Sequence, residues 1–271
     1  MASQKYASTV PLALGKAAHS EGERWVVPDG WQQGRGAWGG LVVAAIVRAA
    51  AAAEADAGFP ARPVRSVSAE IVAPVVDGVA SITCSEVRRG SSTATWTVGI
   101  ISGDQVAVTA SVVFGDDRKG ERLDCPPEAA PEAPPWRDVP VVEIGPPVAP
   151  PFLQHLRIRP ITGMPYSGSS DDISMWLSYP DGAWDEAALL ALVDGPWPVA
   201  LVRISEPRPM ATLSFLATVM IDPGELDPSE PLLFRSHLIA EHSGYLTERR
   251  ALWTADGRLA VENLQLITLI R

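Results

Sequence analysis

The sequence has 271 residues, of which 46% are hydrophobic and 20% are charged, a composition typical of a folded globular protein. Its net charge is −10, and no cluster of Lys and Arg is present that could replace the counterions of a nucleic-acid backbone, so nucleic-acid binding is excluded. Two isolated Cys and four His without metal-ligand spacing predict neither a disulfide framework nor a metal site.

Segments that would direct the chain to a membrane are also lacking. The first twenty residues contain no continuous apolar core of signal-peptide length. The longest apolar run is interrupted at Arg48, short of the ~20 residues that span a bilayer. We therefore expect a cytoplasmic protein with no membrane partner.

The first notable element is GRGAWGGLVVAAIVRAAAAA, residues 34–53, with the spacing G-x-G-x-x-G at Gly34, Gly36 and Gly39. A dinucleotide-binding turn needs a strand immediately before it and an acidic residue that closes a second strand about twenty residues later. Here the polar, turn-forming PDGWQQ precedes the glycines and an unbroken Ala run follows them. The pattern instead predicts a helix over 37–57 that is apolar around most of its circumference, and therefore buried.

The start of this helix is a candidate binding site. Gly39 and Gly40 allow close packing against a sheet. They also leave backbone N–H groups and the positive end of the helix dipole open to a bound carbonyl or anion.

Strands follow, and a proline-rich segment then divides the chain. Alternating stretches at 65–75 and within 80–114 predict long antiparallel strands. Residues 124–151 hold ten of the 25 prolines, which remove backbone donors and fix φ, so this segment is predicted to be an extended connector. The domain boundaries are accordingly placed at 1–123 and 152–271.

The second half repeats the organisation of the first. WDEAALLALV predicts a helix over 184–193, and strands are predicted over 211–221 and within 233–269. The closing strand RLAVENLQLI matches QVAVTASVVF of the first half. The predicted fold class is therefore α+β, with two similar domains that each curl an antiparallel sheet around one helix.

The two halves differ where polar residues enter the apolar pattern. Alternation in the last strand places Gln265 and Asn263 in an apolar row, where a buried amide must be hydrogen-bonded or face a wet cavity. The first half has Val112 at the position of Gln265, and no acidic residue within 34–53, whereas the second half has Asp194 at the end of its helix. One site for the pair of halves is expected, built by the second half and completed by the first.

Structural interpretations of the same residues remain open. Asp194 precedes Gly195-Pro196 as a turn acid would, although a carboxylate is poorly placed at the negative end of a helix dipole. Gln265 could bond to a neighbouring strand, and Thr212 could stand at the start of its strand simply as a β-former.

The chain resembles the double-hotdog acyl-CoA thioesterases, namely the type II bacterial enzymes and their actinobacterial thioesterase-like relatives. The resemblance runs from about Glu23 to Arg271 and rests on the order and spacing of GGLVVAAIVRA, PVRSVSAEIVAPVVDG, EVRRGSST, LLALVDGPWP, ATLSF and LAVENLQLITLIR. It implies two tandem hotdog domains. It also implies a site of Asp194, Thr212 and Gln265 that holds and activates one water for attack on a thioester carbonyl.

These residue types suit thioester hydrolysis, which needs an attacking water, a base and donors for the developing oxyanion. Asp194 can serve as the base, while Thr212 and Gln265 orient the water. Backbone N–H groups near Gly39 and Gly40 can receive the oxyanion. No covalent nucleophile, metal or cofactor is expected.

Contacts to the rest of an acyl-CoA ester are predicted from neighbouring residues. Trp38 is a candidate for the border of an acyl pocket, with the core as the alternative. Arg88 and Arg89, near a predicted turn, are candidates for the coenzyme A phosphates, with a solvated surface as the alternative. The exposed sheet predicts a homodimer.

Two other functions stay open. One is a non-catalytic protein that binds acyl-CoA or another hydrophobic ligand. The other is an enoyl-CoA hydratase or dehydratase, which is disfavoured because no Asp has a His closely downstream.

Overall fold

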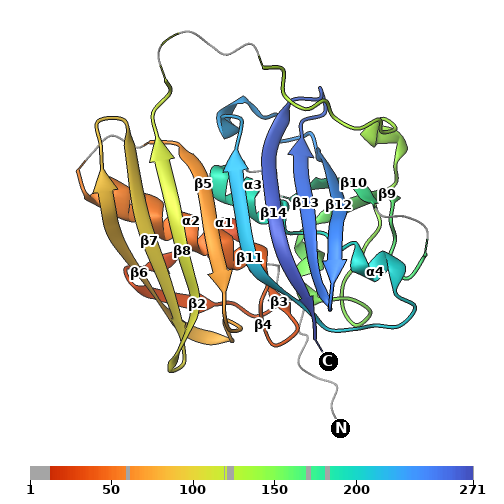
Figure 1. Ribbon diagram of the computed structural model, residues 1–271, viewed down its shortest axis with the longest axis horizontal. Helices are drawn as coiled ribbons and strands as arrows, with labels where there is room; N and C mark the ends of the chain where they lie inside the picture. The colour runs from red at the N-terminus through yellow and green to blue at the C-terminus, as the bar shows by residue number, and fades with distance from the viewer. Residues whose placement is uncertain are drawn as a thin grey trace.

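Figure 1 shows the fold, a computed structural model that describes residues 13–58, 62–118, 120, 125–168, 172–180 and 184–270. Its main feature is one twelve-stranded sheet in which neighbouring strands run antiparallel. In sheet order, the first half contributes β1 (Ser20–Glu21), β2 (Arg24–Val27), β6 (Gly78–Arg89), β7 (Thr93–Ser102), β8 (Gln105–Gly115) and β5 (Val64–Ile71). The second half continues with β11 (Met210–Val219), β14 (Leu259–Leu269), β13 (Tyr245–Trp253), β12 (Leu232–His242), β10 (Asp172–Ser178) and β9 (Arg157–Thr162).

The two halves meet where β5 pairs with β11. Ser68 lies opposite Leu216 at the centre of a paired run that extends from Ser66 with Thr218 to Glu70 with Ser214. The backbone hydrogen bonds therefore run through this seam without a break, and the two halves share a single sheet.

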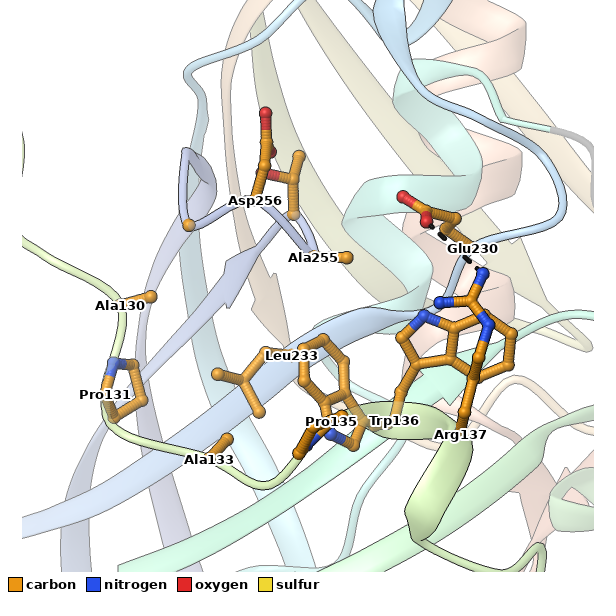
Figure 2. Close-up of a pocket in the computed structure, with 13 residues that line it drawn as sticks. Ala130, Pro131, Ala133, Pro135, Trp136, Arg137, Glu230, Leu233, Ala255 and Asp256 are labelled. Atoms are coloured by element: carbon orange, nitrogen blue, oxygen red, sulfur yellow. Dashed lines mark hydrogen bonds and ion pairs between the residues drawn. The ribbon is translucent and has the colours of Figure 1, made fainter.

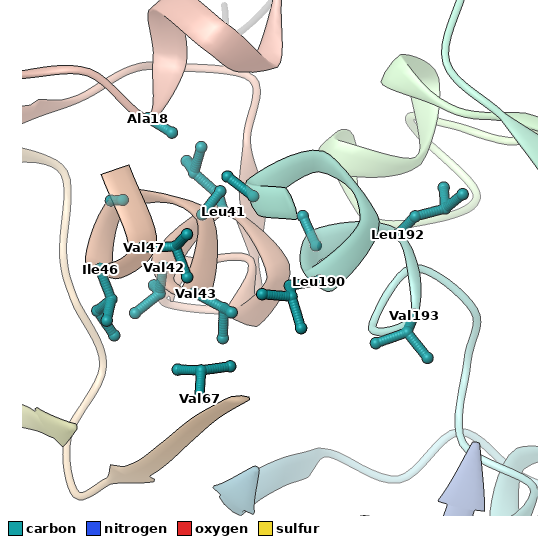
Figure 3. Close-up of a cluster of buried hydrophobic side chains, with 14 of the residues drawn as sticks. Ala18, Leu41, Val42, Val43, Ile46, Val47, Val67, Leu190, Leu192 and Val193 are labelled. Atoms are coloured by element: carbon teal, nitrogen blue, oxygen red, sulfur yellow. The ribbon is translucent and has the colours of Figure 1, made fainter. Parts of the chain in front are cut away.

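Two helices lie side by side on one face of the sheet (Figure 1). They are α2 (Gly39–Asp56) and the shorter α3 (Glu186–Leu192). Side chains of α2 point toward α3 and toward Val67 of β5, as Figure 3 shows. Arg48 of α2 pairs with Asp185 at the start of α3, and the start of α2 meets Asp194 beyond the end of α3, so the helices are antiparallel.

The predicted fold class, α+β with two halves that each combine a curled sheet with a helix, is confirmed. α2 begins at Gly39 rather than 37 because β4 (Gly36–Ala37) pairs with β3 (Gln32–Gln33) in a small ribbon. α3 is only seven residues long, since Gly195-Pro196 follows soon after its end and proline cannot continue a helix. Among the described residues, no helix is long and apolar enough to cross a membrane.

The remaining elements are short. They are the helices α1 (Leu14–Ala17) and α4 (Ala200–Arg203) and the 3₁₀ turns η1 (Trp136–Asp138), η2 (Pro151–His155) and η3 (Pro223–Glu225).

The described part of the proline-rich segment, from residue 125 onward, is packed on the protein rather than suspended between the halves. The indole N–H groups of Trp176 and Trp253 donate to the carbonyls of Pro134 and Glu128, at 3.0 and 3.2 Å. Val139 is buried against these rings on the sheet face opposite the helices. Proline has no backbone N–H, so a proline-rich segment has more carbonyl acceptors than N–H donors. The indole N–H groups of the two tryptophans supply donors to two of these carbonyls.

This packing leaves a groove on the outer face, shown in Figure 2. Its volume is about 480 Å³, and its lining includes Pro131, Trp136 and Leu233. The groove lies between the proline-rich segment and the ends of β12 and β13, away from α2 and α3.

Candidate active site

Asp194 lies two residues beyond α3 in a buried turn, and its side chain is 8% exposed. The amide Nε2 of Gln265 in β14 donates to its Oδ1 at 2.8 Å. The Oε1 of the same amide accepts a hydrogen bond from Thr212 Oγ1 of β11 at 3.2 Å. The structure therefore joins Asp194, Gln265 and Thr212 in one hydrogen-bonded row, although 71 residues separate the first two in the chain.

Asn263 supports the Gln265 amide from the same face of β14. Its Oδ1 accepts from Gln265 Nε2 at 3.1 Å, and its Nδ2 donates to the carbonyl of Leu216 at 2.9 Å. Both amides are 1% exposed, and each has partners for its donor and acceptor, as buried amides require. These bonds fix which end of Gln265 faces Asp194.

The amino terminus of α2 faces the same carboxylate. A Cβ on Gly39 would lie 2.7 Å from Asp194 Oδ2, so only glycine leaves room for the acid. The backbone N–H of Gly40 donates to Asp194. The first N–H groups of a helix lack intrahelical partners and carry its positive dipole end, so α2 stabilises the charged form of Asp194.

Opposing effects set the acidity of Asp194. Burial raises its pKa above the usual value of an aspartic acid. The charge of Arg250, the Gln265 amide, the Gly40 N–H and the Trp38 indole act in the opposite direction, and burial outweighs them. A carboxylate with a raised pKa is a stronger base once it is ionised.

Trp38 is a supporting residue in the core. Its side chain is fully buried and stacks on Phe152 with 4.8 Å between ring centroids. Its indole N–H donates to the backbone carbonyl of Asp194 at 3.2 Å. A Cβ on Gly40 would lie 2.2 Å from the Trp38 ring, so this glycine is required for the indole to reach the turn.

Two charged residues next to Asp194 were not anticipated from the sequence. Arg250 of β13 places Nη1 at 3.9 Å from Asp194 Oδ1, and it is paired with Glu248 on the same strand. Their signal was available in YLTERRALW, because period-2 alternation places both charges in the inward row of Leu246 and Leu252.

Sequence profiles place the chain in a family. The profile of the acyl-CoA thioesterase N-terminal domain matches residues 27–115, and that of the acyl-CoA thioesterase C-terminal domain matches residues 123–269. The chain belongs to the acyl-CoA thioesterase family. The predicted resemblance is thereby confirmed, and the acid, hydroxyl and amide all come from the part that matches the C-terminal domain.

Solved structures show the same architecture. A conserved hotdog-fold protein of unknown function from Alicyclobacillus acidocaldarius is 25% identical, with a TM-score of 0.85 over 97% of this chain and 99% of that one. A proposed thioesterase II from Thermobifida fusca YX is 20% identical, with a TM-score of 0.78 over 97% and 100%. The acyl-CoA thioesterase II TesB2 from Mycobacterium marinum is 17% identical, with a TM-score of 0.73 over 95% and 98%. A comparison with curated proteins finds no match.

The first domain of this thioesterase-family chain lacks the polar strand residues of the second. Val112 pairs with Val67 in β8 and β5, as Gln265 pairs with Phe215 in β14 and β11. Three residues before Val67 and Phe215 stand Val64 and Thr212, each beside an irregularity in strand register. The counterparts of Gln265 and Thr212 are therefore two buried valines.

The acid is missing from the first domain as well. In the second half, Asp194 contacts Gly39 at the start of α2. In the first half, the residue at the same place in α2 is Arg48, which contacts Asp185 at the start of α3. A cation thus takes the place of the carboxylate. The predicted asymmetry between the halves is present in the structure, which brings the acid, hydroxyl and amide together once among the residues that it describes.

Arg88 and Arg89 are not brought to this site. Arg89 forms a bidentate ion pair with Glu54 near the end of α2, at 2.7 and 2.8 Å. Glu54 lies 15 residues after Gly39, about 22 Å along the helix. Arg88 is exposed on the adjacent position of β6.

Proposed function

We propose that this protein hydrolyses acyl-CoA thioesters by direct attack of water. The observation that carries the proposal is the row of Asp194, Gln265 and Thr212 at the amino terminus of α2. It unites a base, a hydroxyl and an amide from three separate elements in a chain of the acyl-CoA thioesterase family. Measuring free thiol released from CoA esters of several acyl lengths tests it.

In the proposed reaction, Asp194 accepts a proton from a water held by Thr212 and Gln265. The water oxygen bonds to the thioester carbonyl carbon and gives a tetrahedral oxyanion. When the carbon–sulfur bond breaks, its electron pair leaves with the CoA sulfur, which takes up the proton. The products are a carboxylic acid and free CoA, and the reaction needs no cofactor.

First-turn N–H groups of α2 are the proposed donors to the oxyanion. Gly39 leaves the backbone at the start of the helix half-buried and open to the Asp194 carboxylate, one oxygen of which reaches it. Because the Gly40 N–H acts on Asp194, the helix end serves both the base and the oxyanion in this scheme.

A non-catalytic binder is the second candidate. The observation that favours it is the completeness of the Asp194 contacts, since a carboxylate with an amide donor, a backbone donor and a nearby guanidinium resembles a structural buried acid. Retention of acyl-CoA without thiol release from any ester of the panel would support it. A hydratase is disfavoured, because the Asp–His contact found in the described part of the chain joins Asp172 and His237 on β10 and β12.

Thr212 offers a test of the water-orienting role. We expect Thr212→Val to lower kcat about tenfold, which is the effect of losing one hydrogen bond of about 1.4 kcal/mol. Thr212→Ser keeps the hydroxyl and should retain most of the activity. Equal kcat values for the valine and serine variants would remove Thr212 from the proposal.

The coenzyme A contact is proposed for Arg88, since Arg89 is committed to Glu54. Arg88→Ala should raise KM for acyl-CoA about tenfold through loss of one charge-assisted contact to phosphate. KM for the acyl-pantetheine ester, which lacks the phosphates, should not change. Arg137, exposed in the proline-rich segment, supplies the control Arg137→Ala. An unchanged KM for acyl-CoA would exclude Arg88 from binding.

We also propose that two copies of the chain form a homodimer through the exposed surface of the sheet. The mass of the protein in solution, measured by light scattering, tests this part separately from activity.

A further inference from the structure

Two charged side chains of β13 face the protein core. Glu248 and Arg250 are 0% and 2% exposed, and Arg250 Nη2 donates to Glu248 Oε2 at 3.0 Å. Buried ion pairs often add no net stability, because well-packed apolar residues of similar size serve as well. The position of this pair, beside Asp194, therefore suggests a role in the site.

Arg250 contacts the Asp194 turn at two places. Its Nη1 lies 3.9 Å from Asp194 Oδ1 and donates to the carbonyl of Pro196 at 3.3 Å. The first distance is too long for a hydrogen bond, so Arg250 acts on Asp194 through its charge. That effect is strong because the low dielectric of the interior screens charges weakly.

Glu248 holds Arg250 in place and also binds the backbone at Val199, five residues after Asp194. Its Oε1 accepts from the backbone N–H of Val199 at 2.7 Å, and its Oε2 accepts from Ser236 Oγ at 3.0 Å. The pair therefore holds the backbone that follows Asp194 at two points, Pro196 and Val199. Arg250 also places a positive charge near the Asp194 carboxylate.

The other groups that face Asp194 carry no charge. They are the Gly40 N–H and the Trp38 indole from α2 and its cap, and the Gln265 amide from β14. Within the described ranges, Arg250 is the charged side chain that acts on Asp194, with Glu248 behind it as its counterion.

We propose that Arg250, oriented by Glu248, is a positioning residue that keeps Asp194 in its carboxylate form and in place for the reacting water. The kinetic part rests on the proposed function, whereas the coupling of the two charges does not. In support, Arg250 has the largest of the effects that lower the pKa of Asp194 against the effect of burial.

The kinetic test compares pH profiles of kcat/KM for acyl-CoA hydrolysis. The double variant Glu248→Gln/Arg250→Gln removes both charges and keeps a polar side chain at each position. We expect its kcat/KM to fall about tenfold at the acidic end of the profile, as loss of a nearby opposite charge requires, with little change on the alkaline plateau. Arg250→Lys retains the charge and should restore much of the acidic limb.

A matched control lies one position away on the same strand. Arg249 points to the outer face and pairs with Glu128 and Glu262, so Arg249→Gln removes a guanidinium charge from the same strand without facing Asp194. Its pH profile should match that of the wild type. A purely structural role for Arg250 would instead lower activity by the same factor at every pH.

A second measurement needs no activity. The folded pKa of Asp194 is raised, so the protonated acid favours the folded state, and this favour is lost as pH rises from the unfolded pKa through the folded one. The unfolding free energy of Asp194→Asn relative to wild type should therefore rise with pH across that window. In the double-variant background, the rise should begin at the same pH and extend to higher pH, because only the folded pKa of Asp194 is raised further.

The outcomes separate the two proposals. If the wild type releases no thiol, but the pH window of the Asp194 contribution to the unfolding free energy changes when Arg250 is replaced, the charge coupling stands and the thioesterase proposal fails. If both the acidic limb and the unfolding window stay in place, the role of Arg250 is wrong. If the double variant does not fold, Glu248→Gln provides the test. Without Glu248 as its counterion, Arg250 should lower the pKa of Asp194 further, so the acidic limb of kcat/KM and the upper end of the unfolding window should both move to lower pH.

Discussion

Asp194→Asn is expected to lower thiol release from acyl-CoA by about 10²–10⁴-fold, the usual contribution of a general base. Asparagine keeps the shape of the side chain, and its carbonyl can still accept from Gln265 Nε2, which donates to Asp194 at 2.8 Å. The lost capacity is the transfer of a proton from water. The loss should appear in kcat rather than in KM, since the base acts in the transition state.

Asp185, at the opposite end of α3 from Asp194, supplies a matched control for this variant. Asp185 caps the start of α3 by accepting from the Ala188 N–H at 2.7 Å, and asparagine is an equally good cap. Asp185→Asn keeps the cap and loses only the partly exposed ion pair with Arg48, which contributes little to stability, so the variant should retain activity and folding. Full thiol release by Asp194→Asn would refute the catalytic assignment, and a large loss of secondary structure in that variant would show that the acid is needed for folding instead.

Gly40→Ala is expected to have the largest effect on stability. The new Cβ would lie 2.2 Å from Cζ2 of Trp38 and 2.6 Å from the carbonyl oxygen of Ala191 in α3. Neither the buried ring nor the helix backbone can move without disturbing the core, so a loss of about 3 kcal/mol is expected, at the upper end for overpacking. Thermal unfolding should show a Tm lower by about 6–12 °C.

Gly15→Ala provides the comparison for that measurement. In α1, the nearest atom to a Cβ at Gly15 is Nη2 of Arg48 at 3.8 Å, an ordinary contact, and alanine favours helix. Its Tm should equal or exceed that of the wild type. A Gly40→Ala variant with an unchanged Tm would mean that Trp38 and α3 are not packed as described.

Sequence patterns were sufficient for the features that depend on local periodicity. The apolar run after Gly39 predicted a buried helix, and alternation predicted β14 with Gln265 on its inward face. The difference between Gln265 and Val112 was also visible, because the repeated strands can be compared position by position. The convergence of Asp194, Thr212 and Gln265 followed from family resemblance, and the structure shows them in hydrogen-bonded contact.

Features that depend on contacts between distant segments could not be read in this way. The pairing of Arg89 with Glu54 is set by the end of α2 meeting β6, so the arginine resembled a surface cation in the sequence. The proline-rich segment has no periodicity to show that tryptophans of β10 and β13 would bind its carbonyls. Alternation in β13 shows that Arg250 faces inward, but its contact with Asp194 could not be read because Asp194 lies on another element.

The continuous seam between β5 and β11 has a consequence for how such a site can change. In a symmetric pair of identical chains, every substitution occurs twice, so losing the acid from one site removes it from the other. Covalent fusion into one sheet frees each copy to vary alone. Here, the first half carries Arg48, Val64 and Val112 at the places of Asp194, Thr212 and Gln265, while the start of its own helix α2 contacts the Asp194 carboxylate of the second half.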